Sequence, residues 1–477
     1  MIALSLAEIA TLLDGQLLLP TETGADTASS DTVVDGSVQT DSRLVEPGSI
    51  FFALPGEETD GHLFAAAAAS AGAALIVVDH ALDLAVPQLV VADGYQALAG
   101  LARGVVARVR AHGTLQIVAI TGSNGKTTTK NMLRAVLEQH GPTVAPQGSF
   151  NNHVGAPISM LRITHETRYL IVEMGASGTG QIQHLMSIVT PDVSVVLKVG
   201  LAHAGNFGGV DAIAEEKAAI VRSLPGQAIA VLNADDHRVQ AMAEQTDAQI
   251  SWFGLSDAAD FRAVDVEPSA SGTEFTLVTS GRRLPVRLRV LGEHHVMNAL
   301  AALDAASVLG IDPTDAIPAI ENVARAARWR MEVLTPSPGI VVINDAYNAS
   351  PDSTAAALKT LAQIVTPEQR SVAVLGEMAE LGEFADEEHD RIGRLIVRLN
   401  VKKLIVVGHR ARHIHNAAGL EGSWDGESVL VESADEAYDL LSEELRPGDV
   451  VLVKSSNSAG LRFLGDRIGG LSAESTS

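Results

Sequence analysis

Residues 117–133 read "IVAITGSNGKTTTKNML", and this stretch decides the fold. A short run of apolar, partly β-branched residues meets a glycine-containing turn, and a lysine, three threonines and a helical pattern follow. Gly122 and Gly125 allow a tight turn whose backbone N–H groups face an anion, together with the N-terminus of the next helix. The order of strand, glycine loop and helix therefore predicts a phosphate-binding site in an α/β domain.

The loop differs from the common G-x-x-x-x-G-K-[ST] pattern, because Ile120 stands where the first glycine is expected. The shorter G-x-x-G-K-T-T form keeps the groups that the chemistry needs. Lys126 supplies a point charge for the β- and γ-phosphates, and Thr127 supplies a hydroxyl for Mg²⁺. The alternative is a glycine turn with a solvated lysine, but the complete order of elements favours phosphate.

Composition limits the class of protein. The chain has 477 residues, 46% of them hydrophobic and 19% charged, which indicates a globular protein of about three domains. Its net charge of −24 disfavours non-specific binding to nucleic acid or to an anionic membrane surface. The absence of cysteine excludes disulfides, thiolate zinc sites and thiol nucleophiles.

The apolar segments give no sign of export or of membrane insertion. Residues 1–19 lack a basic start and carry Glu8 and Asp14, so they predict an amphipathic helix and not a signal peptide. No uncharged apolar stretch reaches the roughly 18 residues of a membrane span. We expect a cytoplasmic monomer.

Short apolar runs alternate with helical stretches along the whole chain, which predicts an α/β protein. We expect three domains, at 1–111, 112–326 and 327–477, the second with a mainly parallel sheet. Residues 250–291 switch to polar–apolar alternation, which suggests an antiparallel insertion.

Polar residues follow several predicted strands, where ligands of open α/β sheets bind. Glu173 could ligate Mg²⁺, cap a helix or lie at the surface. His203 could be structural or a ligand, and Lys217 by itself is typical of a surface lysine paired with a glutamate. Asn298 could contact adenine or begin a helix. These residues by themselves indicate an enzyme that uses Mg²⁺ and ATP, with its chemistry undetermined.

The ordered set of motifs resembles the Mur ligases, which use ATP to add amino acids to the UDP-N-acetylmuramoyl (UDP-MurNAc) peptide of peptidoglycan. The resemblance covers nearly the whole chain, through "QTDSRLVEPGSIFFALPGEETDGHLF", "TGSNGKTTTK", "NNHVGAPISML", "EMGASGTGQI", "LNADD", "NALAA", "DAYNASPDS" and "LGEMAELGE". "EMGASGTGQI" and "LGEMAELG" are similar to the D-alanyl-D-alanine-adding branch, and the D-N-P-R motif of the diaminopimelate-adding branch is absent.

The resemblance implies an N-terminal UDP-MurNAc-peptide-binding domain, a central P-loop ATPase domain and a C-terminal Rossmann-like ligase domain. It implies ligation of D-alanyl-D-alanine to UDP-MurNAc-tripeptide through an acyl phosphate. It also implies Mg²⁺ ligands at Thr127, Glu173 and His203, and a carbamylated Lys217. The residues implied to contact ATP are Gly122, Ser123, Asn124, Gly125, Lys126, Thr127, Thr128, Asn298, Arg330 and Asp345, of which Asp345 corresponds to the ribose-binding acid.

The resemblance places Lys126, Lys217, His203 and Arg330 in catalysis. It assigns substrate binding to Ser42, Arg43, Asn151, Asn152, Tyr347, Asn348 and Ser350. The sequence departs from the family pattern at Lys198, Asn206, His295 and Asn457.

Three other functions compete with this interpretation. Two are enzymes, namely a Mur ligase that adds another amino acid (diaminopimelate or lysine) and a ligase of the folylpolyglutamate synthetase type. The third is a non-catalytic ATP-binding regulator. The uridine-type N-terminal block argues against the folate enzyme, and the presence of Thr127, Glu173, His203 and Lys217 argues against the regulator.

Overall fold

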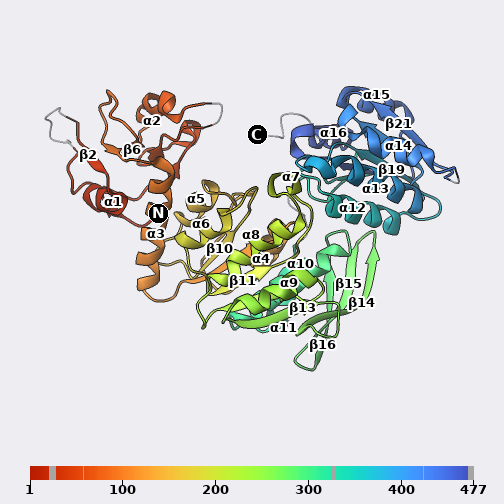
Figure 1. Ribbon diagram of the computed structural model, residues 1–477, viewed down its shortest axis with the longest axis horizontal. Helices are drawn as coiled ribbons and strands as arrows, with labels where there is room; N and C mark the ends of the chain where they lie inside the picture. Colours follow the sequence, from red (N-terminus) through yellow and green to blue (C-terminus); the bar gives the residue numbers. More distant parts are fainter. Residues whose placement is uncertain (21–27, 57–58, 324–327, 423, 471–477) are drawn as a thin grey trace.

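The computed structural model describes residues 1–20, 28–56, 59–323, 328–422 and 424–470. Three large sheets follow one another along these residues, each with helices beside it (Figure 1). This arrangement confirms the α/β class. The domain boundary expected after residue 111 stays a prediction, and the one expected after residue 326 lies outside the described residues.

The N-terminal sheet has the strand order β2-β7-β6-β5-β4, in which only the β2–β7 pair is antiparallel. The expected first helix is α1 (Leu6–Leu13). Ser5 and Glu8 form a capping box at its N-terminus. The remaining elements are β1 (Leu4–Ser5), β2 (Gln16–Leu18), β3 (Val33–Val34), β4 (Val38–Gln39), η1 (Ser42–Leu44), β5 (Ile50–Phe52), η2 (Gly61–Phe64), α2 (Ala65–Ser70), β6 (Leu75–Val78), β7 (Gln88–Val90) and α3 (Gly94–Ala111).

The central sheet has the order β16-β15-β14-β13-β12-β11-β8-β10-β9, and the phosphate loop follows its strand β8 (Gln116–Thr121). Ile117 and Ala119 point into one apolar core, whereas Val118 and Ile120 point into the other. Successive side chains of a strand face opposite sides, so a strand covered on both sides must be apolar throughout. This double burial explains the uninterrupted run "IVAI".

Helices α4 (Lys126–Leu137), α10 (His294–Val308) and α11 (Pro313–Glu321) cover one face of this sheet, and α3 reaches the core on the other face. The other elements are β9 (Thr143–Val144), α5 (Gly155–Met160), β10 (Tyr169–Glu173), α6 (Gln181–Ile188), β11 (Val193–Val196), α7 (Ala204–Phe207), α8 (Val210–Arg222), β12 (Ile229–Asn233), α9 (His237–Ala241) and η3 (Met242–Gln245).

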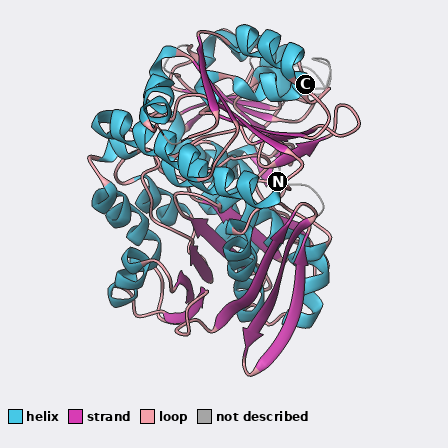
Figure 2. Cartoon of the chain, turned by 90° about the vertical axis from the view of Figure 1, so that its right-hand side faces the viewer, coloured by secondary structure: helices cyan, strands magenta, loops and turns pink. Residues whose placement is uncertain are grey.

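The expected antiparallel segment is present, but it begins later than residue 250. Strand β13 (Gln249–Gly254) pairs in parallel with β12 and with β14 (Phe261–Ser269). Antiparallel pairing starts between β14 and β15 (Gly272–Thr279) and continues to β16 (Arg282–Leu288). These long strands extend the central sheet (Figure 2).

The C-terminal sheet has the order β17-β18-β22-β19-β20-β21, and only its edge strand β17 runs antiparallel. Two apolar cores cover its faces, as in a Rossmann-like fold. Its elements are β17 (Glu332–Leu334), β18 (Val341–Asn344), α12 (Pro351–Ile364), β19 (Arg370–Leu375), η4 (Gly382–Phe384), α13 (Ala385–Arg398), β20 (Lys403–Val407), η5 (His409–Ala411), α14 (Arg412–Leu420), β21 (Glu427–Val431), α15 (Ala434–Glu444), β22 (Asp449–Lys454), η6 (Asn457–Ala459) and α16 (Leu461–Ile468).

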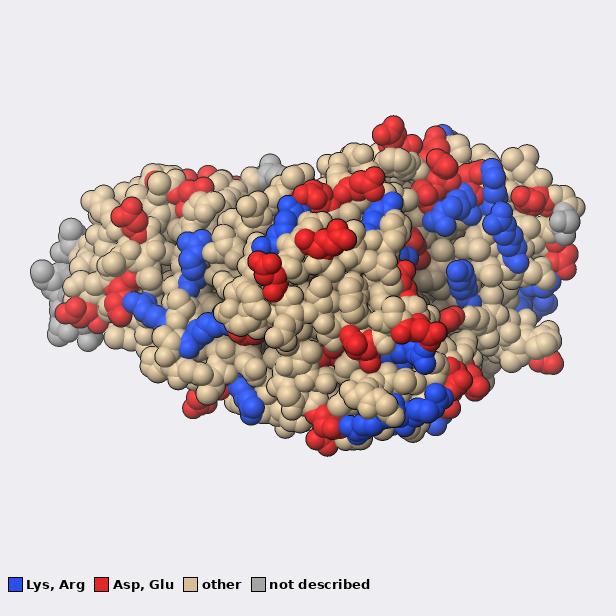
Figure 3. Space-filling model, turned by 60° about the horizontal axis from the view of Figure 1, so that its bottom comes forward, with Lys and Arg blue, Asp and Glu red and all other residues tan. Residues whose placement is uncertain are grey.

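In the described part of the chain, no helix has the length and apolarity that crossing a membrane requires. Basic and acidic side chains are interspersed on the face shown in Figure 3.

Candidate functional site

A cavity of about 410 Å³ lies between the phosphate loop and the C-terminal sheet. Its walls include the carboxyl ends of β10 and β22, the place where ligands of open parallel sheets bind. The structure brings most of the predicted residues to it: Ser123, Asn124, Gly125, Lys126, Thr127, Thr128, Asn151, Glu173, His203, Asn298, Arg330, Asp345, Tyr347 and Asn348.

The phosphate loop requires glycine at position 125. Its φ of +87° lies in the left-handed region, and an added Cβ would lie 2.2 Å from the Asn298 side-chain oxygen. Helix α4 begins at the next residue, Lys126, whose Nζ donates a hydrogen bond of 2.7 Å to the Gly122 carbonyl. Burial lowers the pKa of Lys126, Arg330 adds to that effect, and Glu173 opposes it.

Glu173 is buried at the end of β10, so the surface interpretation of this residue is wrong. The Thr127 hydroxyl donates to its carboxylate at 3.2 Å, and the Asn151 amide donates at 2.9 Å. The Lys130 ammonium lies 3.6 Å away and is equally buried. A hydroxyl and a carboxylate thus meet beside the phosphate loop, which is a set of oxygen donors suited to Mg²⁺.

His203 reaches from the central domain toward the C-terminal one. Its backbone has a φ of +61°, and its Nδ1 contacts the Glu380 carboxylate. The Gly205 backbone N–H donates to the Glu380 carbonyl at 2.9 Å, which joins the same two segments. The imidazole therefore stands on the wall of the cavity with one ring nitrogen already engaged by the C-terminal domain.

Lys217 is buried on α8, so the surface-lysine interpretation of this residue is also wrong. Burial, reinforced by the nearby Lys126 ammonium, lowers its pKa to about 7, against an opposing effect of Glu216. The Glu216 carboxylate itself accepts hydrogen bonds from the backbone N–H groups of Gly180 and Ile182, at 2.6 and 2.7 Å. Near neutral pH, a large fraction of Lys217 is therefore an uncharged amine.

Asn298 lies on α10 at the loop side of the cavity. Its amide nitrogen is 3.1 Å from Nδ1 of His295, and its oxygen accepts from the Thr129 hydroxyl at 3.4 Å. Burial lowers the pKa of His294 to about 4 and that of His295 well below its usual range, so both rings are neutral. Nε2 of His295 has no hydrogen-bond partner among the residues that the structure describes.

Contacts between the central and C-terminal domains close the other wall. Arg330 donates to the Ser149 hydroxyl at 3.0 Å, and its guanidinium stacks 4.2 Å from the centre of the Tyr347 ring. Lys198 pairs with Asp352 at 3.2 Å. Lys198, where the sequence departs from the family pattern, thus contributes a contact between domains.

Other predicted residues lie elsewhere. Arg43 follows Ser42 in the N-terminal domain, has an 86% exposed side chain and pairs with Asp41. The Asn152 side chain accepts from the backbone N–H groups of residues 154 and 155. Ser350 starts α12 as its N-cap and donates to the Asn124 side chain at 3.1 Å.

A second cavity, also of about 410 Å³, adjoins the first, and Ser350, Asn457, Asn348 and His203 are among its lining residues. The departure at Asn457 therefore faces a cavity on the C-terminal side. Lys217 does not line either cavity.

Sequence reasoning missed Lys130, Ser149, Glu380 and Lys454. Lys130 lies one helical turn after Lys126 in "GKTTTK", a spacing that puts both on one side of α4. Lys454 ends the apolar strand "DVVLVK", so it carries the same signal of a polar residue at a strand end that pointed to Glu173. Ser149 and Glu380 lie in loops and carry no such signal.

Comparisons with known proteins agree with this geometry. Residues 36–119 match the Mur ligase family catalytic domain, 120–306 the Mur ligase middle domain and 329–457 the Mur ligase glutamate ligase domain. UDP-N-acetylmuramoyl-tripeptide–D-alanyl-D-alanine ligase of Mycobacterium tuberculosis is 43% identical over 98% of each chain.

Two solved structures are similar over most of their length. MurF from Acinetobacter baumannii has a TM-score of 0.86 at 31% identity, covering 98% of this chain and 99% of that one. MurF from Thermotoga maritima in complex with ADP has a TM-score of 0.78 at 26% identity, covering 91% and 97%. With three matched domains in order and a relative this similar over its whole length, the chain belongs to the Mur ligase family.

Proposed function

We propose that the chain is the ATP-dependent ligase that adds D-alanyl-D-alanine to UDP-MurNAc-tripeptide, acting as a monomer in cytoplasmic peptidoglycan precursor synthesis. One observation carries the ATP-dependent step: Lys126, Thr127 and Glu173 face Arg330 of the C-terminal domain across a single cavity. The 43% sequence identity to the Mycobacterium tuberculosis ligase for these substrates supports their choice.

The reaction forms an amide bond in two steps. A carboxylate oxygen of the tripeptide attacks the γ-phosphorus of ATP, the bond to the β-phosphate oxygen breaks, and an acyl phosphate and ADP result. The free amine of D-alanyl-D-alanine then attacks the acyl carbon, loses a proton, and phosphate leaves. Lys126 and Arg330 stabilise the negative charge on the transferred phosphoryl group by their positions.

The residues beside the loop fit a Mg²⁺ ion. Thr127, Glu173 and His203 would hold it, because the Thr127 hydroxyl contacts the Glu173 carboxylate and the His203 imidazole lines the same cavity. When bound, Mg²⁺ supplies positive charge to the phosphate oxygens. Lys130 and Arg330 hold the segment 146–149 beside that position, Lys130 through the Pro146 and Gly148 carbonyls and Arg330 through the Ser149 hydroxyl.

We also propose that Lys217 carries a carbamate. The positive charges of Lys126, Lys130 and Arg330 outweigh the single carboxylate Glu173 near the loop, so a further ammonium would be repelled. A neutral amine adds CO₂ and releases a proton, which creates an anion, and the pKa of about 7 makes that neutral amine available. The anion would support the metal ion, whereas an ammonium would repel it.

We assign the adenine contact to Asn298, the ribose contact to Asp345 and the uridine end of the substrate to Ser42 and Arg43. The position of Arg43 on the N-terminal domain, away from the ATP cavity, suits a long substrate whose carboxylate end enters the cavity. Asn151 and Asn152 would face the peptide. Tyr347, Asn348 and Ser350 would face the incoming dipeptide.

A phosphate-release assay tests the proposal. UDP-MurNAc-tripeptide and ATP are supplied with D-alanyl-D-alanine, D-alanine or diaminopimelate in turn, and phosphate is measured. We expect release only with the dipeptide. Release with diaminopimelate when UDP-MurNAc-L-alanyl-D-glutamate replaces the tripeptide would instead indicate another Mur ligase activity. No release with either acceptor and any amine would indicate a binding module.

A further inference from the structure

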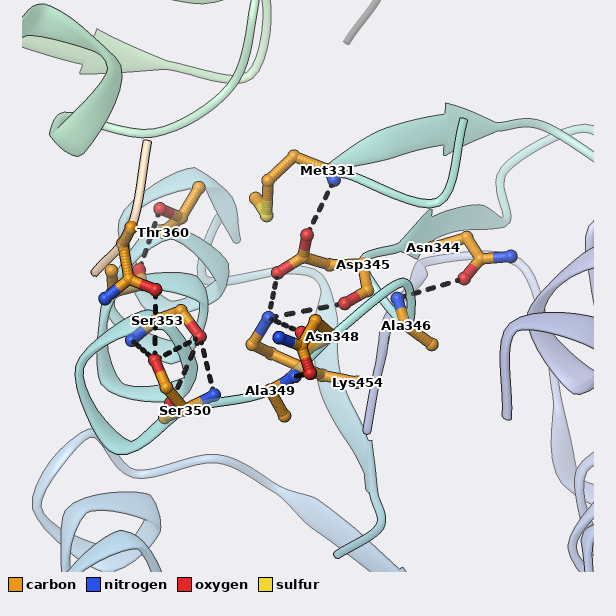
Figure 4. Close-up of polar contacts among 12 residues, drawn as sticks. Met331, Asn344, Asp345, Ala346, Asn348, Ala349, Ser350, Ser353, Thr360 and Lys454 are labelled. Atoms are coloured by element: carbon orange, nitrogen blue, oxygen red, sulfur yellow. Dashed lines mark hydrogen bonds and ion pairs between the residues drawn. The ribbon is translucent and has the colours of Figure 1, made fainter. Parts of the chain in front are cut away.

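Lys454 is a buried lysine in the cavity wall to which the proposed reaction assigns no role. It ends strand β22, and its side chain is 2% exposed. The neighbouring strand β18 ends at Asn344, which pairs in register with Val453, so Asp345 and Lys454 leave the sheet side by side (Figure 4).

The Lys454 ammonium holds the turn that follows β18. Its Nζ donates to the Asp345 carboxylate at 2.6 Å, to the Asn348 carbonyl at 2.9 Å and to the Asp345 carbonyl at 3.3 Å. An ammonium has three N–H donors, so all of them are used within this one turn. Lys454 therefore joins the two ends of the 345–348 segment.

The same turn controls the backbone beside Arg330. The second Asp345 carboxylate oxygen accepts from the Met331 N–H at 3.0 Å, and the Tyr347 N–H donates to the Trp329 carbonyl at 3.0 Å. Trp329 and Met331 have φ values of +60° and +52°, a conformation that side chains other than glycine rarely adopt. Such a conformation persists only where surrounding contacts impose it. Here Asp345 and Tyr347 provide two of these contacts, in addition to Glu332 and Asp466, which accept hydrogen bonds from Trp329.

We propose that Lys454 is a positioning residue that couples the nucleotide side of the site to the dipeptide side. Through Asp345 it orients the ribose contact and the strained backbone that presents Arg330. Through Asn348 it fixes the segment that lines both cavities. This inference rests on the proposed function for the identity of the ligands, but not for the geometry of the turn.

Lys403 offers a matched control in the same sheet. Its side chain is 4% exposed, and its ammonium pairs with Glu444 at 2.9 Å and with Glu427 at 3.2 Å. It begins strand β20, so it lies at the edge of the parallel sheet opposite to Lys454. Lys454→Met and Lys403→Met thus each remove the ion pairs of one buried ammonium, and only Lys454 lies in the cavity wall.

The test compares both variants with the wild type. We expect Lys454→Met to weaken ADP binding at least tenfold in calorimetry and to raise the KM for ATP and for D-alanyl-D-alanine, with a smaller change in kcat. Lys403→Met should stay within about twofold of wild type, as expected for a substitution away from the site. Wild-type values in Lys454→Met, or equal losses in both variants, would overturn the inference.

Amide hydrogen exchange in the absence of ligands separates this inference from the proposed function. Lys454→Met should increase the rate of hydrogen exchange at the amides of Met331 and Tyr347, and Lys403→Met should leave it unchanged. Unchanged exchange in Lys454→Met overturns the coupling whatever the substrates are. Faster exchange in an enzyme that releases no phosphate with any amine supports the coupling and refutes the proposed function.

Discussion

Replacing Lys217 with methionine should stabilise the ligand-free protein while it abolishes ligation. The pKa of this buried amine is lowered from 10.5 to about 7, so the folded state disfavours the ammonium form. The folded pKa lies below the unfolded one, so stability falls as the pH decreases from 10.5 to about 7. Methionine has a similar length and no charge, and it fills buried space well.

The expected gain follows from the shift. The pKa of Lys217 falls from 10.5 in the unfolded chain to about 7 in the folded one. At about 1.36 kcal/mol for each pKa unit, the gain in stability at pH 7 has an upper limit near 5 kcal/mol. Relaxation of the site and contact with water reduce this value, so we expect a gain of about 2 kcal/mol or more. The gain should vanish at pH above 10.5, where both states hold the neutral amine.

Hydrogen exchange of the segment 210–222 in bicarbonate-free buffer measures this stability locally, because a chain of three domains need not unfold as one unit. The exposed Lys359 on α12 provides the control, and Lys359→Met should change stability by less than about 0.5 kcal/mol. A Lys217→Met protein that is less stable than wild type at pH 7, or that ligates normally, would refute the reasoning.

Further predictions address the loop, the metal position and the core. Lys126→Ala should abolish ATP-dependent ligation with the fold intact by circular dichroism, and near-normal turnover would contradict the assigned role. Gly125→Ala should weaken ADP binding at least tenfold in calorimetry, because its Cβ would lie 2.2 Å from Asn298 at a φ of +87°. Glu173→Gln should raise the Mg²⁺ concentration needed for half-maximal phosphate release, and an unchanged value would exclude Glu173 as a ligand. Burial raises the pKa of Asp304 to about 7 from 3.8, so its stabilising contribution is present below pH 3.8 and is lost as the pH rises through about 7. Asp304→Asn should therefore be more stable than wild type at pH 8 in hydrogen exchange of α10, by up to about 4 kcal/mol, and equal stability would refute the burial argument.

Residues that act through local sequence could be predicted well. The turn at Gly125 and the start of α4 at Lys126 follow from a glycine loop between an apolar strand and a helix. Glu173 ends β10 and Asp345 follows β18, and ligands of parallel sheets bind beyond the carboxyl ends of the strands. These two strands belong to different sheets, so only the packing of the domains brings the two carboxylates to the same cavity. The structure places all four on one cavity.

The role of a residue that acts through burial or through contact between domains could not be predicted from the sequence around it. Lys217 looks like a surface lysine in "AIAEEKAAI", and only the packing of α8 buries it and so lowers its pKa to about 7. Antiparallel pairing begins later than the polar–apolar alternation indicates, because β13 alternates in sequence and yet pairs in parallel with both of its neighbours.

The sequence by itself determined the α/β class, the phosphate loop and the family, because each of these follows from short segments in a fixed order. Only the tertiary structure shows which polar groups from distant parts of the chain meet. It placed Arg330 against Ser149, His203 against Glu380 and Lys454 against Asp345. The physical reason is that pKa shifts and ion pairs depend on distance and burial, which are set by the packing of segments far apart in the chain.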